Sequence, residues 1–152
     1  MIKREVSGDH RFWKRLEQVI LNQPRANDGW CPDGGHALWQ QLAFYNYLQV
    51  GLSAPGHRPT QGQFNDSWKP FWAVLNLLRP ERVLVCGKDL WNGMETTHEE
   101  LHADIQAYRL DNGENAWCLA IRHPSRWLPS HELIVAFLDD PKNAKALLEA
   151  RR

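Results

Sequence analysis

Helical spacing of apolar residues predicts five helices spread along the chain. They cover residues 9–22, 36–41, 66–78, 133–138 and 142–151. In these stretches apolar residues recur three or four positions apart, which is typical of a helix with one buried face. The flanking residues fit these bounds: Pro24 follows the first helix, Asp66 or Asn65 can cap the third, and Asp140 with Pro141 can start the last.

Shorter apolar runs predict strands between these helices. Four such runs stand out, at residues 42–45, 82–87, 105–110 and 116–121. The first is apolar on both faces, as expected for a central strand. The turn sequence Asp111-Asn-Gly-Glu-Asn115 joins the last two runs as a hairpin. The pattern predicts one domain over residues 1–152, a three-layer α/β/α sandwich with a small, mainly parallel central sheet.

The strand predicted at residues 116–121 is followed by an abrupt change to polar residues. Pro124 has no backbone N–H and restricts His123 to extended geometry, so we expect the strand to end there. The side chains of His123, Ser125 and Arg126 then lie on the loop at the strand's carboxyl end. In open α/β sheets this is the edge where ligands bind.

Three motifs follow one another in a fixed order between residues 44 and 129. The first is Phe44-Tyr-Asn46 with Gly56-His-Arg58-Pro59 after it, the second is Arg79-Pro-Glu-Arg-Val-Leu-Val-Cys-Gly87-Lys88, and the third is His123-Pro124-Ser125. With this order and spacing, the chain resembles the uracil-DNA glycosylase superfamily, most closely its thermophilic bacterial and archaeal branch. The resemblance implies a uracil-DNA glycosylase-like fold. It also implies hydrolysis of the N-glycosidic bond of a deaminated or damaged base in DNA.

The resemblance also implies roles for individual residues. Asn46, together with Gly87 and Lys88, would bind the edge of a flipped-out pyrimidine, and a site built to hydrogen-bond one base rejects others strongly. His123 would be catalytic, donating to a carbonyl oxygen of the leaving base as negative charge develops there. The implied DNA contacts come from the loops and are Arg58, Ser125, Arg126 and Trp127.

Two superfamily features are missing from this sequence. The Gly-x-x-Pro-Gly-like motif that positions the attacking water does not precede Asn46 after an earlier strand. Cys31-Pro32-Asp33-Gly34-Gly35 has suitable residue types, so Asp33 is the catalytic candidate in its place, with Asp28 as a further acid nearby. The branch's iron–sulfur cluster needs four cysteines, whereas this chain has three that are widely spaced. We therefore expect no cofactor.

Composition narrows the expected partners and location. The 152 residues include 18 basic and 18 acidic side chains, a net charge of zero that argues against holding nucleic acid by bulk charge. The three cysteines are odd in number and widely spaced, which favours buried free thiols in a reducing compartment. No apolar run reaches membrane-spanning length, so a cytoplasmic protein without membrane contact is expected.

His98 and His102 have metal-ligand spacing on a predicted helix but lack a third ligand, so a solvated helix and no metal are favoured.

Three functions remain open from the sequence. The first is a glycosylase acting on single- or double-stranded DNA, and the second is a non-catalytic relative that binds a nucleobase, nucleotide or nucleic acid. The third is a protein-interaction domain that uses exposed tryptophans, for which Trp91 and Trp127 are the candidates. A polar pocket between Asn46 and His123 would favour the first two, and a filled pocket beside a flat apolar surface would favour the third.

Overall fold

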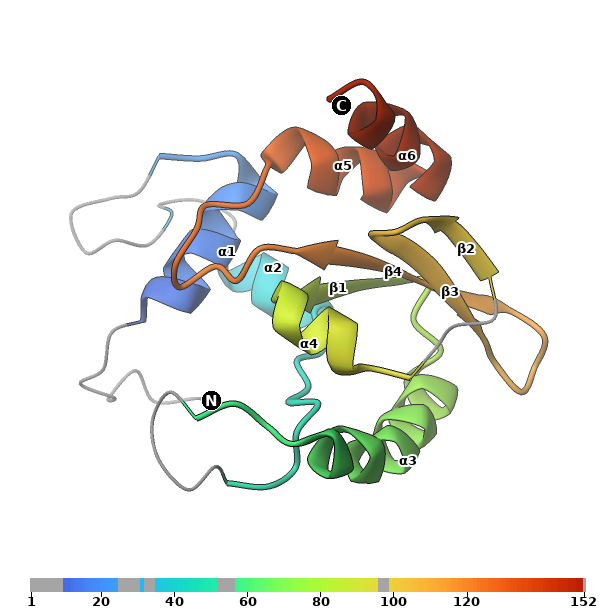
Figure 1. The fold of residues 1–152 in the computed structure, drawn as a ribbon. Helices are drawn as coiled ribbons and strands as arrows, with labels where there is room; N and C mark the ends of the chain where they lie inside the picture. Colours follow the sequence, from blue (N-terminus) through green and yellow to red (C-terminus); the bar gives the residue numbers. More distant parts are fainter. Residues whose placement is uncertain (1–9, 25–30, 32–34, 52–56, 96–98, 152) are drawn as a thin grey trace.

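The computed structural model describes residues 10–24, 31, 35–51, 57–95 and 99–151. It has an α/β fold with a four-stranded sheet in the order β1-β4-β3-β2 and helices on both faces (Figure 1). The strands are β1 (Arg82–Cys86), β2 (Glu99–His102), β3 (Ile105–Arg109) and β4 (Asn115–Ile121). The helices are α1 (Arg11–Leu21), α2 (Gly35–Gln41), α3 (Gln61–Leu78), α4 (Lys88–Gly93), α5 (His131–Asp139) and α6 (Pro141–Glu149).

The sheet is mixed, so the expectation of a mainly parallel sheet is wrong. β1 pairs in parallel with β4, whereas β3 pairs antiparallel with both β4 and β2. The connections explain this arrangement, because short turns can join only antiparallel neighbours. The turn after Arg109 uses Gly113 at a φ of 85°, and two residues separate β2 from β3. The hairpin signal at Asp111–Asn115 was therefore read correctly.

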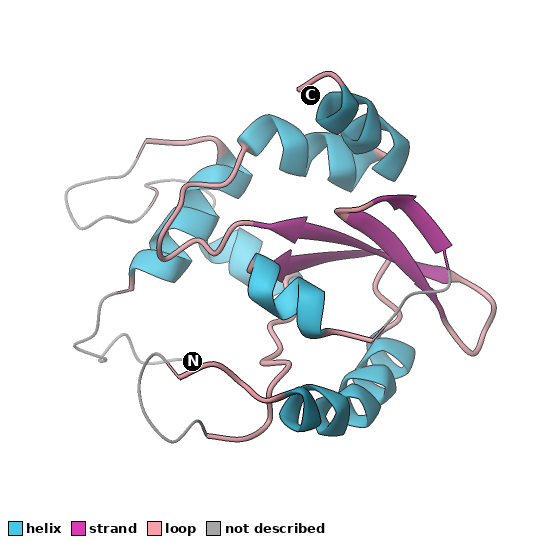
Figure 2. Cartoon of the chain, viewed as in Figure 1, coloured by secondary structure: helices cyan, strands magenta, loops and turns pink. Residues whose placement is uncertain are grey.

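The strand predicted at residues 42–45 is wrong, because residues 42–51 carry no strand (Figure 2). Tyr47 instead packs its ring on α3, with centroids 5.2 Å from Phe71 and 6.2 Å from Phe64. Its hydroxyl donates to the carbonyl oxygen of Phe64 at 3.2 Å. Side-chain packing thus anchors this segment to the core without a strand ladder, and Asn46 does not stand at a strand's carboxyl end.

Two apolar clusters cover the two faces of the sheet. The aromatic face lies against α3 and α4, and its buried core includes Tyr47, Phe64, Phe71, Trp91 and Tyr108. The aliphatic face lies against α1, α5 and α6, and its buried core includes Leu16, Ile105, Leu119, Ile134 and Phe137. This placement of helices on both faces agrees with the layered α/β arrangement expected from the sequence.

The ends of most helices follow the predicted signals. Asp140 caps α6 by accepting from the N–H of Lys142 at 2.8 Å, and Pro141 occupies the first turn. α3 differs, since it begins at Gln61 under a capping box between Thr60 and Gln63, so the predicted caps at Asn65 and Asp66 are wrong. Its start was missed because the first turn carries few apolar residues.

Three further expectations concern side chains and membranes. Residues 99–102 form β2 rather than a helix, so His102 does not share a helical face with His98, which lies outside the described residues. All three cysteines are free, as expected, with Cys31 and Cys118 buried and Cys86 half-buried. Burial raises the pKa of the Cys86 thiol to about 12.

Among the described residues, none of the helices combines the length and apolar character needed to span a bilayer.

Candidate functional site

The loop after β4 holds His123 in a tight turn. The N–H groups of Arg126 and Trp127 donate to the carbonyl oxygen of His123 at 3.0 and 3.1 Å. The N–H of Ser125 donates to Nδ1 of His123 at 3.3 Å, and the Ser125 hydroxyl lies 2.7 Å from the same nitrogen. Because Nδ1 accepts from a backbone N–H, we assign the neutral ring's proton to Nε2. His123 therefore presents a hydrogen-bond donor on its outer side.

The His123 ring lies between α1 and the turn after β1. Its centroid is 5.3 Å from that of Phe12, and a Cβ added at Gly87 would lie 3.7 Å from Cδ2 of His123. Gly87 adopts a φ of 129°, a conformation that favours glycine, and its N–H donates to the carbonyl oxygen of Ile121 at 2.9 Å. Partial burial of the ring, together with the Arg126 guanidinium, lowers the pKa of His123. The imidazole is therefore neutral near pH 7.

Helix α1 holds the same loop through Arg15. One guanidinium nitrogen of Arg15 donates to the carbonyl oxygens of Pro124 at 3.3 Å and Ser125 at 3.1 Å. These bonds join residues that are more than a hundred positions apart in the sequence, and Figure 1 shows the loop after β4 passing against α1. The backbone that directly follows His123 is thereby fixed to α1.

Exposed aromatic rings lie on the His123 loop and against α1. The ring of Phe44 is 4.5 Å from Trp13 and 6.0 Å from Phe12 between centroids, yet its side chain remains 55 % exposed. Trp127 is likewise 55 % exposed, and the Arg122 guanidinium lies 5.0 Å from its ring centroid. We call this region the strand-end surface, defined by Phe12, Arg15, Phe44, Gly87 and residues 122–127.

The structure brings some of the sequence-predicted residues together and separates others. Gly87, His123, Ser125, Arg126 and Trp127 all lie at the carboxyl ends of β1 and β4. Asn46 is exposed on the segment before α3, and its backbone carbonyl oxygen accepts from the side chain of Gln49. Trp127 is exposed as expected, whereas Trp91 is buried, contrary to expectation.

Three predicted site residues need separate mention. The Lys88 ammonium forms an ion pair with Asp104 and donates to the carbonyl oxygen of Ala120 at 3.3 Å, so it faces the sheet. Arg58 is highly exposed, with its guanidinium 3.9 Å from the Asp89 carboxylate in the first turn of α4. Asp33 and Asp28, the candidates for positioning a water, lie outside the described residues.

Sequence reasoning missed Phe12, Arg15 and Phe44 as members of this surface. Their positions in the sequence predicted ordinary helix and strand residues. One signal was available, because Phe12 and Trp13 are adjacent on α1 and point about 100° apart on a helix, too far for both rings to face one core evenly. The contacts of Arg15 with the loop are tertiary and left no local signal.

Two pockets in the described part of the chain are lined by other residues. One, of about 270 Å³, lies between α4 and the β2–β3 hairpin, and the other, of about 260 Å³, lies between the end of α1 and residues 128–131. Neither includes Asn46, Gly87, Lys88 or His123 in its lining. The described residues contain no group of three His, Cys, Asp or Glu side chains placed to hold a metal ion.

Comparison with known proteins adds no relative. No protein family, curated protein or solved structure matches this chain. Interpretation of the strand-end surface therefore depends on its own geometry and chemistry.

Proposed function

We propose that this protein binds nucleic acid through the strand-end surface, as a uracil-DNA glycosylase-like domain. The observation that carries the proposal is that exposed aromatic and basic side chains lie together on the strand-end surface. Phe44 and Trp127 offer exposed ring faces on which unpaired bases can stack. Arg122 and Arg126 are exposed on the same loop and can contact phosphates.

Local charge supports this proposal despite the net charge of zero. Residues 10–16 and 122–130, the two segments joined by Arg15 and Phe12, contain five Lys and Arg side chains and no Asp or Glu. The basic residues are Arg11, Lys14, Arg15, Arg122 and Arg126. A local basic rim attracts phosphates within about 8–10 Å at physiological salt, so the overall balance of charge does not prevent binding.

Base excision is the second candidate function, and the state of His123 favours it. A neutral imidazole with its proton on Nε2 can donate to a base carbonyl oxygen without first becoming a cation. The hydrogen bonds at Nδ1 and the lowered pKa of His123 both support that state. Excision also requires a group that positions water, and Asp33 remains the candidate from the sequence.

The binding proposal is tested with a labelled single-stranded oligonucleotide and a duplex of the same sequence, titrated at fixed salt. Trp127→Ala should weaken binding by roughly 5- to 150-fold, since stacking contributes about 1–3 kcal/mol per base. Leu77→Ala, at an 80 % exposed site on α3, is the matched control and should not change affinity. Absence of binding by the wild-type chain at low salt, or equal affinity of wild type and Trp127→Ala, would reject the proposal.

Excision is tested separately with uracil-containing oligonucleotides and a His123→Ala variant. Cleavage that His123→Ala abolishes would establish the glycosylase activity. If the wild-type chain binds these oligonucleotides but cleaves none across a panel of damaged bases, the activity is rejected and the binding function stands.

A further inference from the structure

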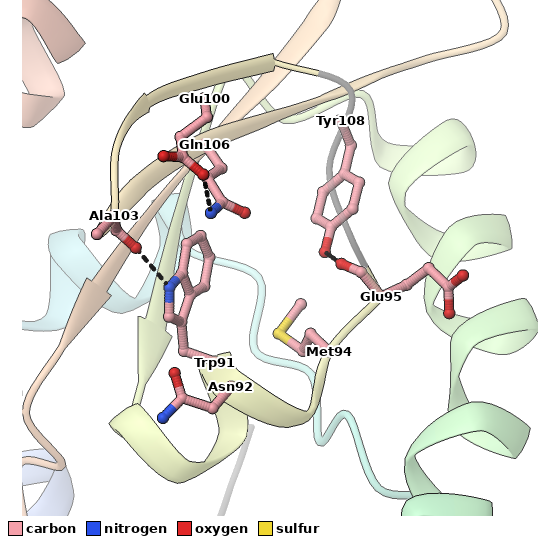
Figure 3. Close-up of a pocket in the computed structure, with 8 residues that line it drawn as sticks. All are labelled: Trp91, Asn92, Met94, Glu95, Glu100, Ala103, Gln106 and Tyr108. Carbon is pink, nitrogen blue, oxygen red and sulfur yellow. Dashed lines mark hydrogen bonds between the residues drawn. The ribbon is translucent and has the colours of Figure 1, made fainter.

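The pocket between α4 and the β2–β3 hairpin lies apart from the strand-end surface and has a different character. Its volume is about 270 Å³, and Trp91 and Met94 form part of its wall. Figure 3 shows the side chains of Trp91, Met94 and Gln106 around a common space, with the carboxylate of Glu95 directed away from it. We infer that this pocket binds a small organic cation, an ammonium or guanidinium group on a short alkyl chain.

The hydrogen bonds of the pocket wall carry this inference. The indole Nε1 of Trp91 donates to the carbonyl oxygen of Ala103 at 2.9 Å, and the Tyr108 hydroxyl donates to that of Glu95 at 2.8 Å. The wall's indole and phenol donors are therefore already used. Each carbonyl oxygen has two lone pairs, so the same bonds leave accepting capacity on Ala103 and Glu95. A ligand that supplies N–H donors matches such a wall.

The negative charge of the pocket wall favours a cationic ligand over a neutral one among the ligands that can donate hydrogen bonds. The Glu100 carboxylate lies in the wall, and the Gln106 amide donates to its Oε2 at 3.2 Å, which orients the carboxylate and leaves its second oxygen as an acceptor (Figure 3). None of the described lining residues is Lys, Arg or His. Among these described residues an anionic ligand such as a phosphate would meet only like charge, whereas an ammonium or guanidinium group forms a charge-assisted hydrogen bond with Glu100.

The size and apolar part of the pocket limit the ligand further. A volume of about 270 Å³ lies near the lower end of the range for small-molecule sites, which suits a cation with a few carbon atoms. The alkyl stem would lie against the Trp91 indole and the Met94 thioether, as the stems of long basic side chains lie along apolar surfaces. The source of the cation is either a free amine or a Lys or Arg side chain of a partner protein.

The test is a titration of the full chain followed by amide and indole N–H chemical shifts. Butylguanidine and butylamine should give saturable shifts at the Trp91 indole and the Gln106 amide, with a Kd of about 1 mM. Butylurea, a neutral molecule of similar shape, should bind far more weakly. An acetyl-Gly-Arg-Gly-amide peptide distinguishes the sources: tighter binding than butylguanidine indicates a protein side chain, and weaker binding indicates a free amine.

Two neighbouring glutamates on β2 provide a matched pair of variants. Glu100→Gln should weaken butylguanidine binding by about tenfold through loss of the charged acceptor. Glu99→Gln should change it by less than about twofold, because Glu99 instead accepts from the Asn115 side chain at 3.1 Å and does not line the pocket. The inference is overturned if butylurea binds as well as butylguanidine, if no saturable shift occurs at these groups, or if both variants lose equal affinity.

Discussion

The two faces of the sheet are built from different kinds of side chain. On the aromatic face, rings from α3, α4 and the segment around Tyr47 fill the space against the sheet. On the aliphatic face, three helices bring mainly Leu, Ile and Val side chains to the strands, together with the buried ring of Phe137. Each aromatic side chain buries about 150–250 Å², so fewer regular elements are needed to cover a face. The segment that the sequence pattern suggested as an additional strand packs the rings of Tyr45 and Tyr47 on this face instead.

The rings of the aromatic face also carry polar atoms into the core. The hydroxyls of Tyr47 and Tyr108 and the indole N–H of Trp91 each donate to a backbone carbonyl oxygen. Burial is the largest cause that raises the pKa of Tyr47 to about 12, and it raises that of Tyr108 as well. The comparison predicts that the aromatic face is the more sensitive to small changes of shape and of hydrogen bonding.

The largest expected effect comes from adding one methyl group at Gly93. A Cβ there would lie 2.5 to 2.7 Å from three ring atoms of Phe64, closer than van der Waals contact allows. Gly93→Ala should lower the free energy of unfolding by about 1–3 kcal/mol, as overpacking does elsewhere. Urea denaturation measures this loss. Gly51→Ala is the control, since nothing lies within 4 Å of its added Cβ, and equal effects of the two variants would mean that this face is loosely packed.

A smaller effect separates two tyrosines on the same face. Tyr108→Phe removes a hydroxyl that donates to Glu95 at 2.8 Å and should cost about 1 kcal/mol. The buried hydroxyl of Tyr45 has no hydrogen-bond partner among the described residues, so Tyr45→Phe should leave stability unchanged or raise it. Thermal unfolding of both variants checks the difference. A larger loss for Tyr45→Phe would contradict the assignment of these hydrogen bonds.

The smallest effect lies at the strand-end surface, in the pH dependence of His123. Its pKa is lowered in the folded chain, so the unfolded chain takes up the proton first as the pH falls below about 6.5. The contribution of the neutral His123 ring to the free energy of unfolding is therefore fully present above about pH 6.5. It is lost as the pH falls toward the lower pKa of His123 in the folded chain. Between about pH 7.5 and about pH 5, the Tm of the wild type should fall slightly more than that of His123→Asn. A smaller fall for the wild type would contradict the direction of the shift.

Local signals predicted much of the second half of the chain correctly. Pro124 ends β4 shortly after Ile121, and Asp140 caps α6. Each of these residues acts on its own backbone or on residues next to it, so its effect can be read without knowledge of the fold.

The first half of the chain was predicted less well because its conformation depends on distant contacts. An apolar run such as residues 42–45 fits a buried strand, but strand formation also requires a partner strand with free hydrogen-bonding groups. The neighbouring Tyr47 ring packs on α3 instead, and Phe44 remains exposed beside α1. Arg15 likewise contacts a loop far away in sequence, and no local pattern encodes such a bond.

The pairing of β1 with β4 has a consequence for the order in which the chain acquires structure during synthesis. Residue Arg82 pairs with Trp117, and the hairpin of β3 and β4 lies between β1 and the chain end. During synthesis β1 therefore cannot form its ladder until β4 has left the ribosome. β3 and β4 are close in sequence and can pair as soon as both have been made. α1 waits longer still, because Val19 meets His131 of α5. A nascent chain that stops before β4 therefore lacks the strand with which β1 pairs. It also lacks the loop whose carbonyl oxygens accept from Arg15 of α1.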